Sequence, residues 1–231
     1  MKKHAFFVTG TDTEVGKTFI TQGLLLAMDA AGLSTAAYKP VAAGCEQTNQ
    51  GLRNEDALLL QAASNIALTY SEVNPIAFAE PVAPHLAAQN LAQNISLQAI
   101  NYGFIHLQQK QTDVLMVEGA GGWRLPLGRN SIGVQQYLSD FAMQHKLPVI
   151  MVVGMRLGCL NHALLTAQAI CFDGLQLVGW VANQINSEMP YLDENIQSLK
   201  EQLNAPFIGS VPKLDGPEKA LEYLDLSSLF A

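Results

Sequence analysis

The chain has 231 residues, of which 49% are hydrophobic, and its 13 basic and 20 acidic residues give a formal net charge of −7. This negative balance, without any basic run, argues against a surface that binds nucleic acid or anionic membranes. The longest apolar stretch, residues 147–155, is far shorter than the ~18 residues of a membrane span, and three scattered cysteines favour a reducing, cytoplasmic environment.

Short apolar runs alternate along the chain with longer stretches of helical periodicity. The first run precedes residues 17–31, where Ile20, Leu24 and Met28 recur at helical spacing. Apolar runs separated by helices indicate a doubly wound, mostly parallel α/β sheet with helices on both faces, here as a single domain over residues 1–231. The predicted strands are Ala5–Thr9, Thr35–Tyr38, Val114–Val117, Pro148–Val153, Leu177–Ala182 and Phe207–Val211. Residues 47–54 and 186–193 are predicted loops.

Glycines, charged residues and prolines follow these strands at their carboxyl ends. They are Gly10, Lys39-Pro40, Glu118-Gly119, residues 154–158, Asn183 and Pro212. In a doubly wound sheet, ligands bind at the carboxyl edge of the strands. We therefore expect these segments to converge on one site.

The first strand leads into GTDTEVGKT, residues 10–18, and then into the first helix. Glycines let a loop turn its N–H groups towards a phosphate at a helix N-terminus. Lys17 is then expected to reach the β- and γ-phosphates of a nucleotide, and Thr18 to bind Mg²⁺. This P-loop has five residues between Gly10 and Gly16 instead of the usual four, and two of the five are acidic.

Two carboxylates are candidates for the magnesium site. Glu118 ends the apolar strand VLMV and is costly to bury without a nearby cation. Asp56 lies where a helix begins, so a metal ligand and a helix cap are equally good interpretations for it.

Lys39 follows an apolar strand at the same expected edge as Lys17. A solvated lysine at a strand end is the ordinary alternative. Two lysines near one triphosphate indicate that negative charge develops beyond the γ-phosphate, as in transfer to an anionic acceptor.

An ordered set of segments across nearly the whole chain resembles the dethiobiotin synthetases. They are GTDTEVGKT, YKPVAAG, GLRNEDALLL, NPIAFAEPVAPH, VEGAGGW, PVIMVVGMRLGCLNHALLT, GWVAN and the VP at 211–212. The five-residue loop is itself a mark of this family. The resemblance implies an ATP- and Mg²⁺-dependent ligase of biotin biosynthesis that forms a cyclic urea from 7,8-diaminononanoate and CO₂, through a carbamate and a carbamic–phosphoric anhydride.

The resemblance also assigns roles to individual residues. Lys39, Lys17 and Thr11 become the catalytic residues, and Thr18, Asp56 and Glu118 the metal ligands. The implied nucleotide-binding residues are Glu14, Val15, Gly16, Lys17, Thr18, Phe19, Asp56, Glu118, Gly119, Ala120, Gly121, Asn183, Gln184, Val211, Pro212 and Lys213. The implied substrate-binding residues are Thr11, Lys39, Ala43, Gly158, Cys159, Leu160 and Asn161.

The family further implies a homodimer in which Gly158–Asn161 of one subunit binds the substrate carboxylate in the site of the other. One residue departs from the family pattern: Ala43 stands where a serine that contacts the substrate is common. Outside the motifs, we expect Cys45 and Cys159 to be small core fillers, and we slightly favour a packing role for His85 over a place in the site.

Two other functions compete with this interpretation. A dimeric regulatory P-loop ATPase is expected to carry a second lysine within the loop and an exposed amphipathic or basic surface, and neither is visible. An amidoligase-like enzyme that takes ammonia from glutamine needs an added glutaminase domain with a Cys–His pair, for which the chain has no room.

Overall fold

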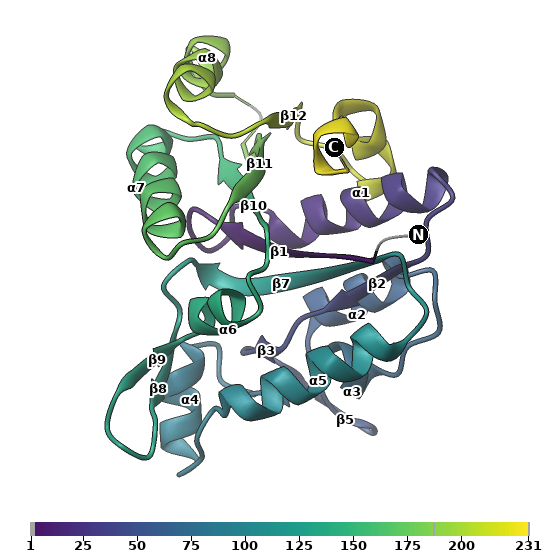
Figure 1. Ribbon diagram of the computed structural model, residues 1–231, viewed down its shortest axis with the longest axis vertical. Helices are drawn as coiled ribbons and strands as arrows, with labels where there is room; N and C mark the ends of the chain where they lie inside the picture. The colour runs from purple at the N-terminus through teal and green to yellow at the C-terminus, as the bar shows by residue number, and fades with distance from the viewer. Residues whose placement is uncertain (1–2, 187, 231) are drawn as a thin grey trace.

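A parallel sheet of six strands forms the centre of the computed structural model, which describes residues 3–186 and 188–230. The strand order is β12-β11-β10-β1-β7-β2, and every neighbouring pair is parallel (Figure 1). The strands are β1 (His4–Gly10), β2 (Thr35–Tyr38), β7 (Val114–Gly122), β10 (Val149–Gly154), β11 (Leu177–Asn183) and β12 (Phe207–Val211). The six predicted strands and the doubly wound fold are confirmed.

Several strands extend further than their apolar runs indicate. Glu118 still pairs with Val8, and Gly122 with Gly10, so the expected turn after Val117 is part of β7. Glycine and a buried acid interrupt the apolar pattern, and the register with β1 shifts between Val8 and Gly10, but the pairing continues to Gly122. The carboxyl edge is therefore built partly from strand residues, which fixes their backbone positions.

Helices cover both faces of the sheet (Figure 1). They are α1 (Lys17–Ala30), α2 (Glu55–Ala63), α3 (Tyr70–Val73), α4 (Pro84–Asn90), α5 (Leu97–Gln109), α6 (Leu138–Gln144), α7 (Cys159–Phe172), α8 (Leu192–Gln202) and the 3₁₀ helices η1 (Pro217–Tyr223) and η2 (Ser227–Leu229). One core lies under α1, α2, η1 and η2, and the other under α4 to α8. None of the described helices is long and apolar enough to cross a membrane.

Successive side chains of each strand alternate between the two hydrophobic cores. In β1, Phe6 and Val8 belong to the core under α1, whereas Phe7 belongs to the other. Successive side chains of a strand point to opposite faces, so a strand covered on both sides must be apolar throughout. This explains why the strands read as continuous apolar runs.

Three pairs of short strands lie outside the main sheet. They are β3 (Val41–Ala42) with β6 (Ile76–Ala77), β4 (Glu46–Thr48) with β5 (Gly51–Arg53), and β8 (Pro126–Arg129) with β9 (Gln135–Tyr137). The β4–β5 hairpin corrects the predicted loop over residues 47–54. All of its residues except Gly51 and Leu52 are polar, and Thr48 Oγ1 closes the turn on the carbonyl of Gly51 at 2.8 Å. Polar strands give no apolar signal.

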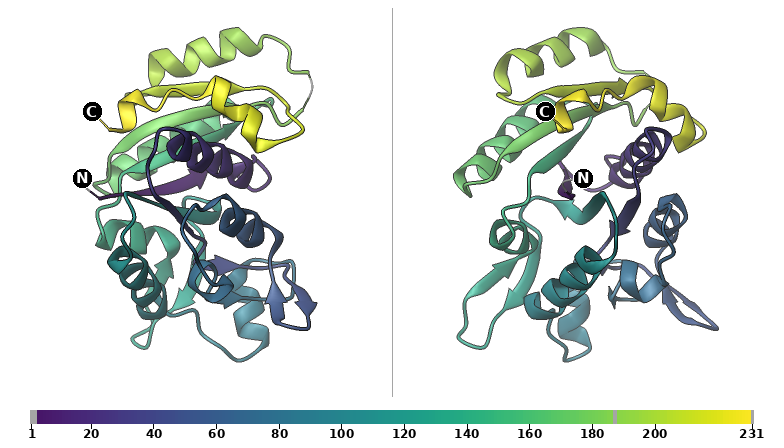
Figure 2. Two further views of the ribbon diagram at one scale, coloured as in Figure 1. Left: turned by 90° about the vertical axis from the view of Figure 1, so that its right-hand side faces the viewer. Right: turned by 45° about the vertical axis from the view of Figure 1, so that its right-hand side comes forward.

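The second predicted loop, residues 186–193, gives way to α8 at Leu192, and Ser187 lies outside the described residues. The described ends of the chain lie side by side at the start of β1 (Figure 2). There the rings of His4 and Phe230 are 5.2 Å apart. The two ends therefore meet at the amino end of the sheet, away from the loop after β1.

Candidate active site

The loop between β1 and α1 has the form expected of a phosphate-binding loop. Gly16 has a φ of 81°, in the left-handed region, and α1 begins at the next residue, Lys17. A side chain at this position would collide with the amide of Asn183, whose Nδ2 donates to the carbonyl of Val15 at 2.9 Å. Glycine is therefore required at position 16 by both conformation and space.

The two acidic side chains of the loop are accommodated outside its backbone. Arg156, in the turn after β10, forms an ion pair with Asp12, and Glu14 is exposed to solvent. Arg156 lies within residues 154–158, which were expected at this edge of the sheet, but its pairing with Asp12 was not predicted. The loop acids thus need not oppose a bound phosphate.

Lys17 is almost fully buried, and its ammonium donates to the carbonyl of Asp12 at 3.1 Å. Burial lowers the pKa of Lys17, although the negative charge of Glu118 opposes this effect. A buried cation at the start of α1 favours an anionic ligand, because the charge has few other partners.

Lys39 lies between two carboxylates. Its Nζ is 2.7 Å from Glu118 Oε1 and 3.0 Å from Asp56 Oδ2, and only 5% of its side chain is exposed. Burial acts to lower the pKa of Lys39, but the two carboxylates outweigh burial and hold it above its usual value. The alternative of a solvated lysine at the strand end is wrong.

Glu118 connects Lys39 to the P-loop helix. Its Oε1 also accepts from Thr18 Oγ1 at 2.8 Å, whereas its Oε2 is buried without a hydrogen-bond partner among the described residues. A buried acceptor left without a partner calls for a donor or a cation. Carboxylates and a hydroxyl are oxygen ligands of the kind that Mg²⁺ prefers, with phosphate and water completing its shell. The residues present fit that ion.

Asp56 is not the cap of α2. The cap is Asn54, whose Oδ1 accepts from Ala57 N at 3.2 Å. Burial acts to raise the pKa of Asp56, but Lys39 next to it outweighs this effect and lowers the pKa. The helix-cap interpretation of Asp56 is therefore wrong, its carboxylate lies beside Lys39, and its role as a metal ligand stays a prediction.

Five of the residues predicted to bind the nucleotide line one cavity of about 150 Å³ at the ends of β11 and β12. The lining residues are Phe19, Asn183, Gln184, Ile185, Pro212, Lys213 and Leu214. Val211 is fully buried and does not line the cavity. Its carbonyl accepts from Gln184 N at 2.9 Å and so holds one of the lining residues in place. Ile185 and Leu214 were missed because an apolar lining residue carries no chemical signature. The size of the cavity suits part of a flat ring.

The remaining nucleotide-side residues, Gly119, Ala120 and Gly121, lie in β7 next to the P-loop. A side chain on Gly121 would contact Thr13 at 3.7 Å. Thr11 is half-buried, and its amide donates to Val152 O at 3.0 Å, which fixes the start of the loop.

The segment Gly158–Asn161 forms the start of α7. Gly158 has a φ of 93°, and the first intrahelical bond runs from His162 N to Gly158 O at 3.2 Å. Cys159 is buried in the core, as predicted for a filler, so a ligand here would meet its backbone and the more accessible Leu160 and Asn161. The Arg156–Asp12 pair holds this turn against the P-loop.

Three other predicted residues lie apart from these contacts. Ala43 is half-buried, and its carbonyl accepts from Asn54 Nδ2 at 3.4 Å. Cys45 is buried, in agreement with a filler role. His85 lines a separate cavity between α4 and the β8–β9 hairpin, with Nδ1 unpaired among the described residues.

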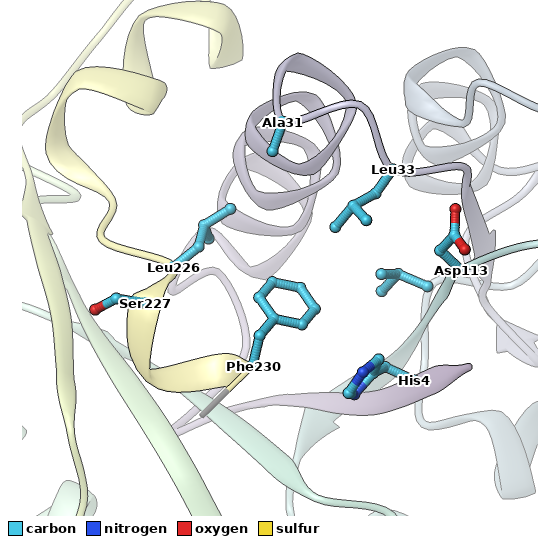
Figure 3. Close-up of a pocket in the computed structure, with 8 residues that line it drawn as sticks. His4, Ala31, Leu33, Asp113, Leu226, Ser227 and Phe230 are labelled. Atoms are coloured by element: carbon cyan, nitrogen blue, oxygen red, sulfur yellow. The ribbon is translucent and has the colours of Figure 1, made fainter. Parts of the chain in front are cut away.

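A further, mostly apolar cavity of about 420 Å³ lies at the amino ends of the strands (Figure 3). His4, Leu33 and Phe230 line it, together with Asp113, whose carboxylate already accepts from Ser34 N and Oγ. It lies at the edge of the sheet opposite to Lys17 and Lys39 and shares no residue with the site described above.

The loop after β1, the lysine at the start of α1 and the buried acid of β7 define a P-loop nucleotide-binding protein on a doubly wound sheet. A family model described as an AAA domain matches residues 4–219. The chain is 50% identical over 231 residues to the ATP-dependent dethiobiotin synthetase BioD of Cellvibrio japonicus, covering 99% of both chains. It is 53% identical over 228 residues to that of Pseudomonas aeruginosa, covering 97% of both. The chain belongs to the dethiobiotin synthetases, which are ATP-dependent ligases of biotin biosynthesis.

Solved structures support the fold at low sequence identity. The MinD cell division protein of Aquifex aeolicus in complex with MinC matches with a TM-score of 0.55 and 14% identity, over 92% of this chain and 82% of that chain. A second structure of that MinD matches with a TM-score of 0.53 and 13% identity, over 95% and 85%. These likenesses concern the arrangement of strands and helices alone.

Proposed function

We propose that this protein closes the ureido ring of dethiobiotin from 7,8-diaminononanoate and CO₂ at the expense of ATP. An amine of the substrate captures CO₂ and releases a proton to form a carbamate. A carbamate oxygen attacks the γ-phosphorus, which displaces ADP and gives a carbamic–phosphoric anhydride. The second amine attacks the carbonyl carbon and expels phosphate. The observation that carries the proposal is the buried ammonium of Lys39 at the same sheet edge as Lys17, in a chain about half identical to named synthetases over its full length.

The two lysines take different parts. Lys17 starts α1, where the backbone N–H groups of the loop also gather, so it serves the β- and γ-phosphates. Lys39 is paired with Glu118 and serves the carbamate and the transferring phosphoryl group, where negative charge accumulates in the transition state. Thr11, at the start of the loop, lies on the carbamate side.

Thr18, Asp56 and Glu118 would hold Mg²⁺, with Glu118 Oε2 as the atom that still needs a partner. When bound, the ion neutralises phosphate charge as the phosphoryl group moves. The cavity lined by Asn183, Gln184 and Lys213 receives the adenine ring, with Gly119–Gly121 along the nucleotide.

The carboxylate of the substrate lies at the far end of an alkyl chain, beyond the reach of the P-loop. We propose that the first turn of α7 in a second copy of the chain binds it, since free amides at a helix N-terminus favour an anion. Exposed apolar side chains beside and along α7 support a partner on this helix: Leu157, just before it, is 99% exposed, Leu165 is 56% exposed, and Phe172, at its carboxyl end, is 88% exposed. The active protein is then a homodimer with shared sites.

The test is conversion of the diamine to dethiobiotin by purified protein, followed by mass spectrometry with and without ATP. ATP hydrolysis is measured in parallel. A synthetase consumes little ATP until diamine and bicarbonate are both present. Steady ATP hydrolysis without them, and no new product, would favour a regulatory ATPase and overturn the proposal.

A further inference from the structure

The short helix α3 holds the backbone of Lys39 from both sides. Lys39 N donates to the carbonyl of Val73 at 2.8 Å, and Lys39 O accepts from Asn74 Nδ2 at 2.6 Å. Strand pairing with β7 ends at Tyr38, so these two bonds take over from the sheet at the lysine itself. The path of the chain at Lys39 thus depends on α3 as well as on β2.

One hydroxyl joins this contact to the segment that carries Asp56. Tyr70 OH donates to Asn74 Oδ1 at 2.9 Å and accepts from Asn54 N at 2.8 Å. Asn54 caps α2, and Asp56 follows two residues later. The chain of bonds therefore runs from the backbone of Lys39 through Asn74 and Tyr70 to the start of α2.

The bonds of this chain are buried at Lys39 and partly buried at Tyr70. Asn74 is 3% exposed, Asn54 is 8% exposed and Tyr70 is half-buried. The guanidinium of Arg53 lies 4.3 Å from the centre of the Tyr70 ring, which holds the ring from its face. Burial raises the pKa of Tyr70, so its hydroxyl stays protonated and remains a donor to Asn74 at neutral pH. Buried hydrogen bonds of this kind restrict a group to one position, because the alternatives leave polar atoms unpaired.

We infer that Tyr70 and Asn74 are positioning residues for the phosphoryl transfer: they set Lys39 relative to Asp56. Within residues 3–186 and 188–230, neither side chain forms a hydrogen bond to Lys17 or to the cavity lined by Asn183. Their effect should therefore fall on Lys39 and on its position relative to Asp56, and not on Lys17 or the nucleotide cavity. This inference rests on the role given to Lys39 under the proposed function.

The direct test removes the hydroxyl and keeps the ring, in Tyr70→Phe. A shift of about 1 Å at a reacting group can cost about a hundredfold in rate, so we expect kcat to fall at least about tenfold. KM for ATP should stay near wild type, because the P-loop contacts are untouched. Asn74→Ala, which removes the middle of the chain of bonds, should give the same selective loss of kcat.

Tyr102→Phe is the matched control, since Tyr102 is 75% exposed. Lys39→Ala is the reference, and thermal unfolding of each variant sets an assay temperature at which all are folded. If Tyr70→Phe has the same kcat as Tyr102→Phe while Lys39→Ala is impaired, the inference about Tyr70 and Asn74 is overturned and the role of Lys39 stands. A joint change in kcat and KM for ATP that tracks lost stability would make α3 merely structural. Wild-type kcat in Lys39→Ala would remove the proposed role of Lys39 and the inference with it.

Discussion

Nζ of Lys39 lies 2.7 Å from Oε1 of Glu118, although the two residues are 79 positions apart in the sequence. The register of the sheet explains the contact. Tyr38 is paired with Val117 across β2 and β7, so the next residue of each strand reaches the carboxyl edge at the same level. A fixed backbone thus presents a cation and an anion to each other in a buried place.

Replacing Glu118 by Gln should destabilise the protein. The amide keeps the size of the side chain but removes its charge, which leaves Asp56 as the one carboxylate beside the buried ammonium of Lys39. Breaking a buried pair costs about 3–5 kcal/mol, and we expect about 3 kcal/mol because Asp56 stays in place. Urea unfolding measures the change. Asp215→Asn, which breaks the exposed pair with Lys219, is the control and should leave the midpoint unchanged. A wild-type midpoint for Glu118→Gln would show that the pair does not stabilise the fold.

Lys17→Ala and Lys39→Ala should impair the enzyme in different ways. Lys17 serves the phosphates in the ground state and in the transition state, so its loss should weaken ATP binding and turnover together. Lys39 serves the transferring group, so its loss should lower kcat with ATP affinity largely kept. Calorimetric titration with a non-hydrolysable ATP analogue and steady-state kinetics separate the two. Equal loss of ATP affinity in both variants would contradict this division.

Ala43→Ser should improve the fit to the diamine. Ala43 is half-buried, so its side chain is not enclosed on all sides, and serine adds only one oxygen atom to it. One hydrogen bond contributes about 0.5–1.5 kcal/mol, which limits the fall in KM for the diamine to about tenfold. A rise in KM instead would mean that another group already fills the space.

Two inactive variants should restore activity when they share a dimer. Lys39→Ala impairs the phosphoryl side, and Asn161→Trp blocks the first turn of α7 at an exposed position. Cys159 is unsuitable for this purpose because it is buried in the core. Mixed by unfolding and refolding, about half of the dimers are hybrids with one intact site of two, so about a quarter of wild-type activity should return. Hybrids shown by mass spectrometry to be present but inactive would mean that each subunit builds its own site.

Glu72→Gln should change how stability depends on pH. Burial acts to raise the pKa of Glu72, but bonds from Lys110, Thr69 and His106 outweigh it and lower the pKa from 4.5 to about 2. The folded state then binds the proton less tightly than the unfolded state, so the stabilisation is complete above pH 4.5 and is lost as pH falls towards about 2.

Urea midpoints of wild type and Glu72→Gln should therefore differ most near neutral pH and converge in acid. Glu80→Gln, at an exposed position, is the control variant. A difference between wild type and Glu72→Gln that is the same at every pH would mean that the lost contacts, and not the charge, are responsible.

Local signals in the sequence determined the sheet and the nucleotide loop. A strand buried on both faces has to be apolar along its length, so β1, β2 and β12 are visible as apolar runs, and a glycine-rich loop ahead of an amphipathic helix marks the start of α1. The P-loop chemistry follows from residues that are adjacent in the chain. Lys17 and Thr18 could be predicted as one site because they are neighbours in the sequence.

Tertiary structure alone decided which distant residues meet. No spacing in the sequence shows that Asn54, and not Asp56, caps α2, that Arg156 pairs with Asp12, or that Tyr70 links α2 to the backbone of Lys39. The polar β4–β5 hairpin gave no apolar signal, and Ile185 and Leu214 line their cavity by position only. Strand register and the packing of loops set these contacts, and both depend on the whole core. Two polar residues far apart in the chain become partners only when folding brings them together.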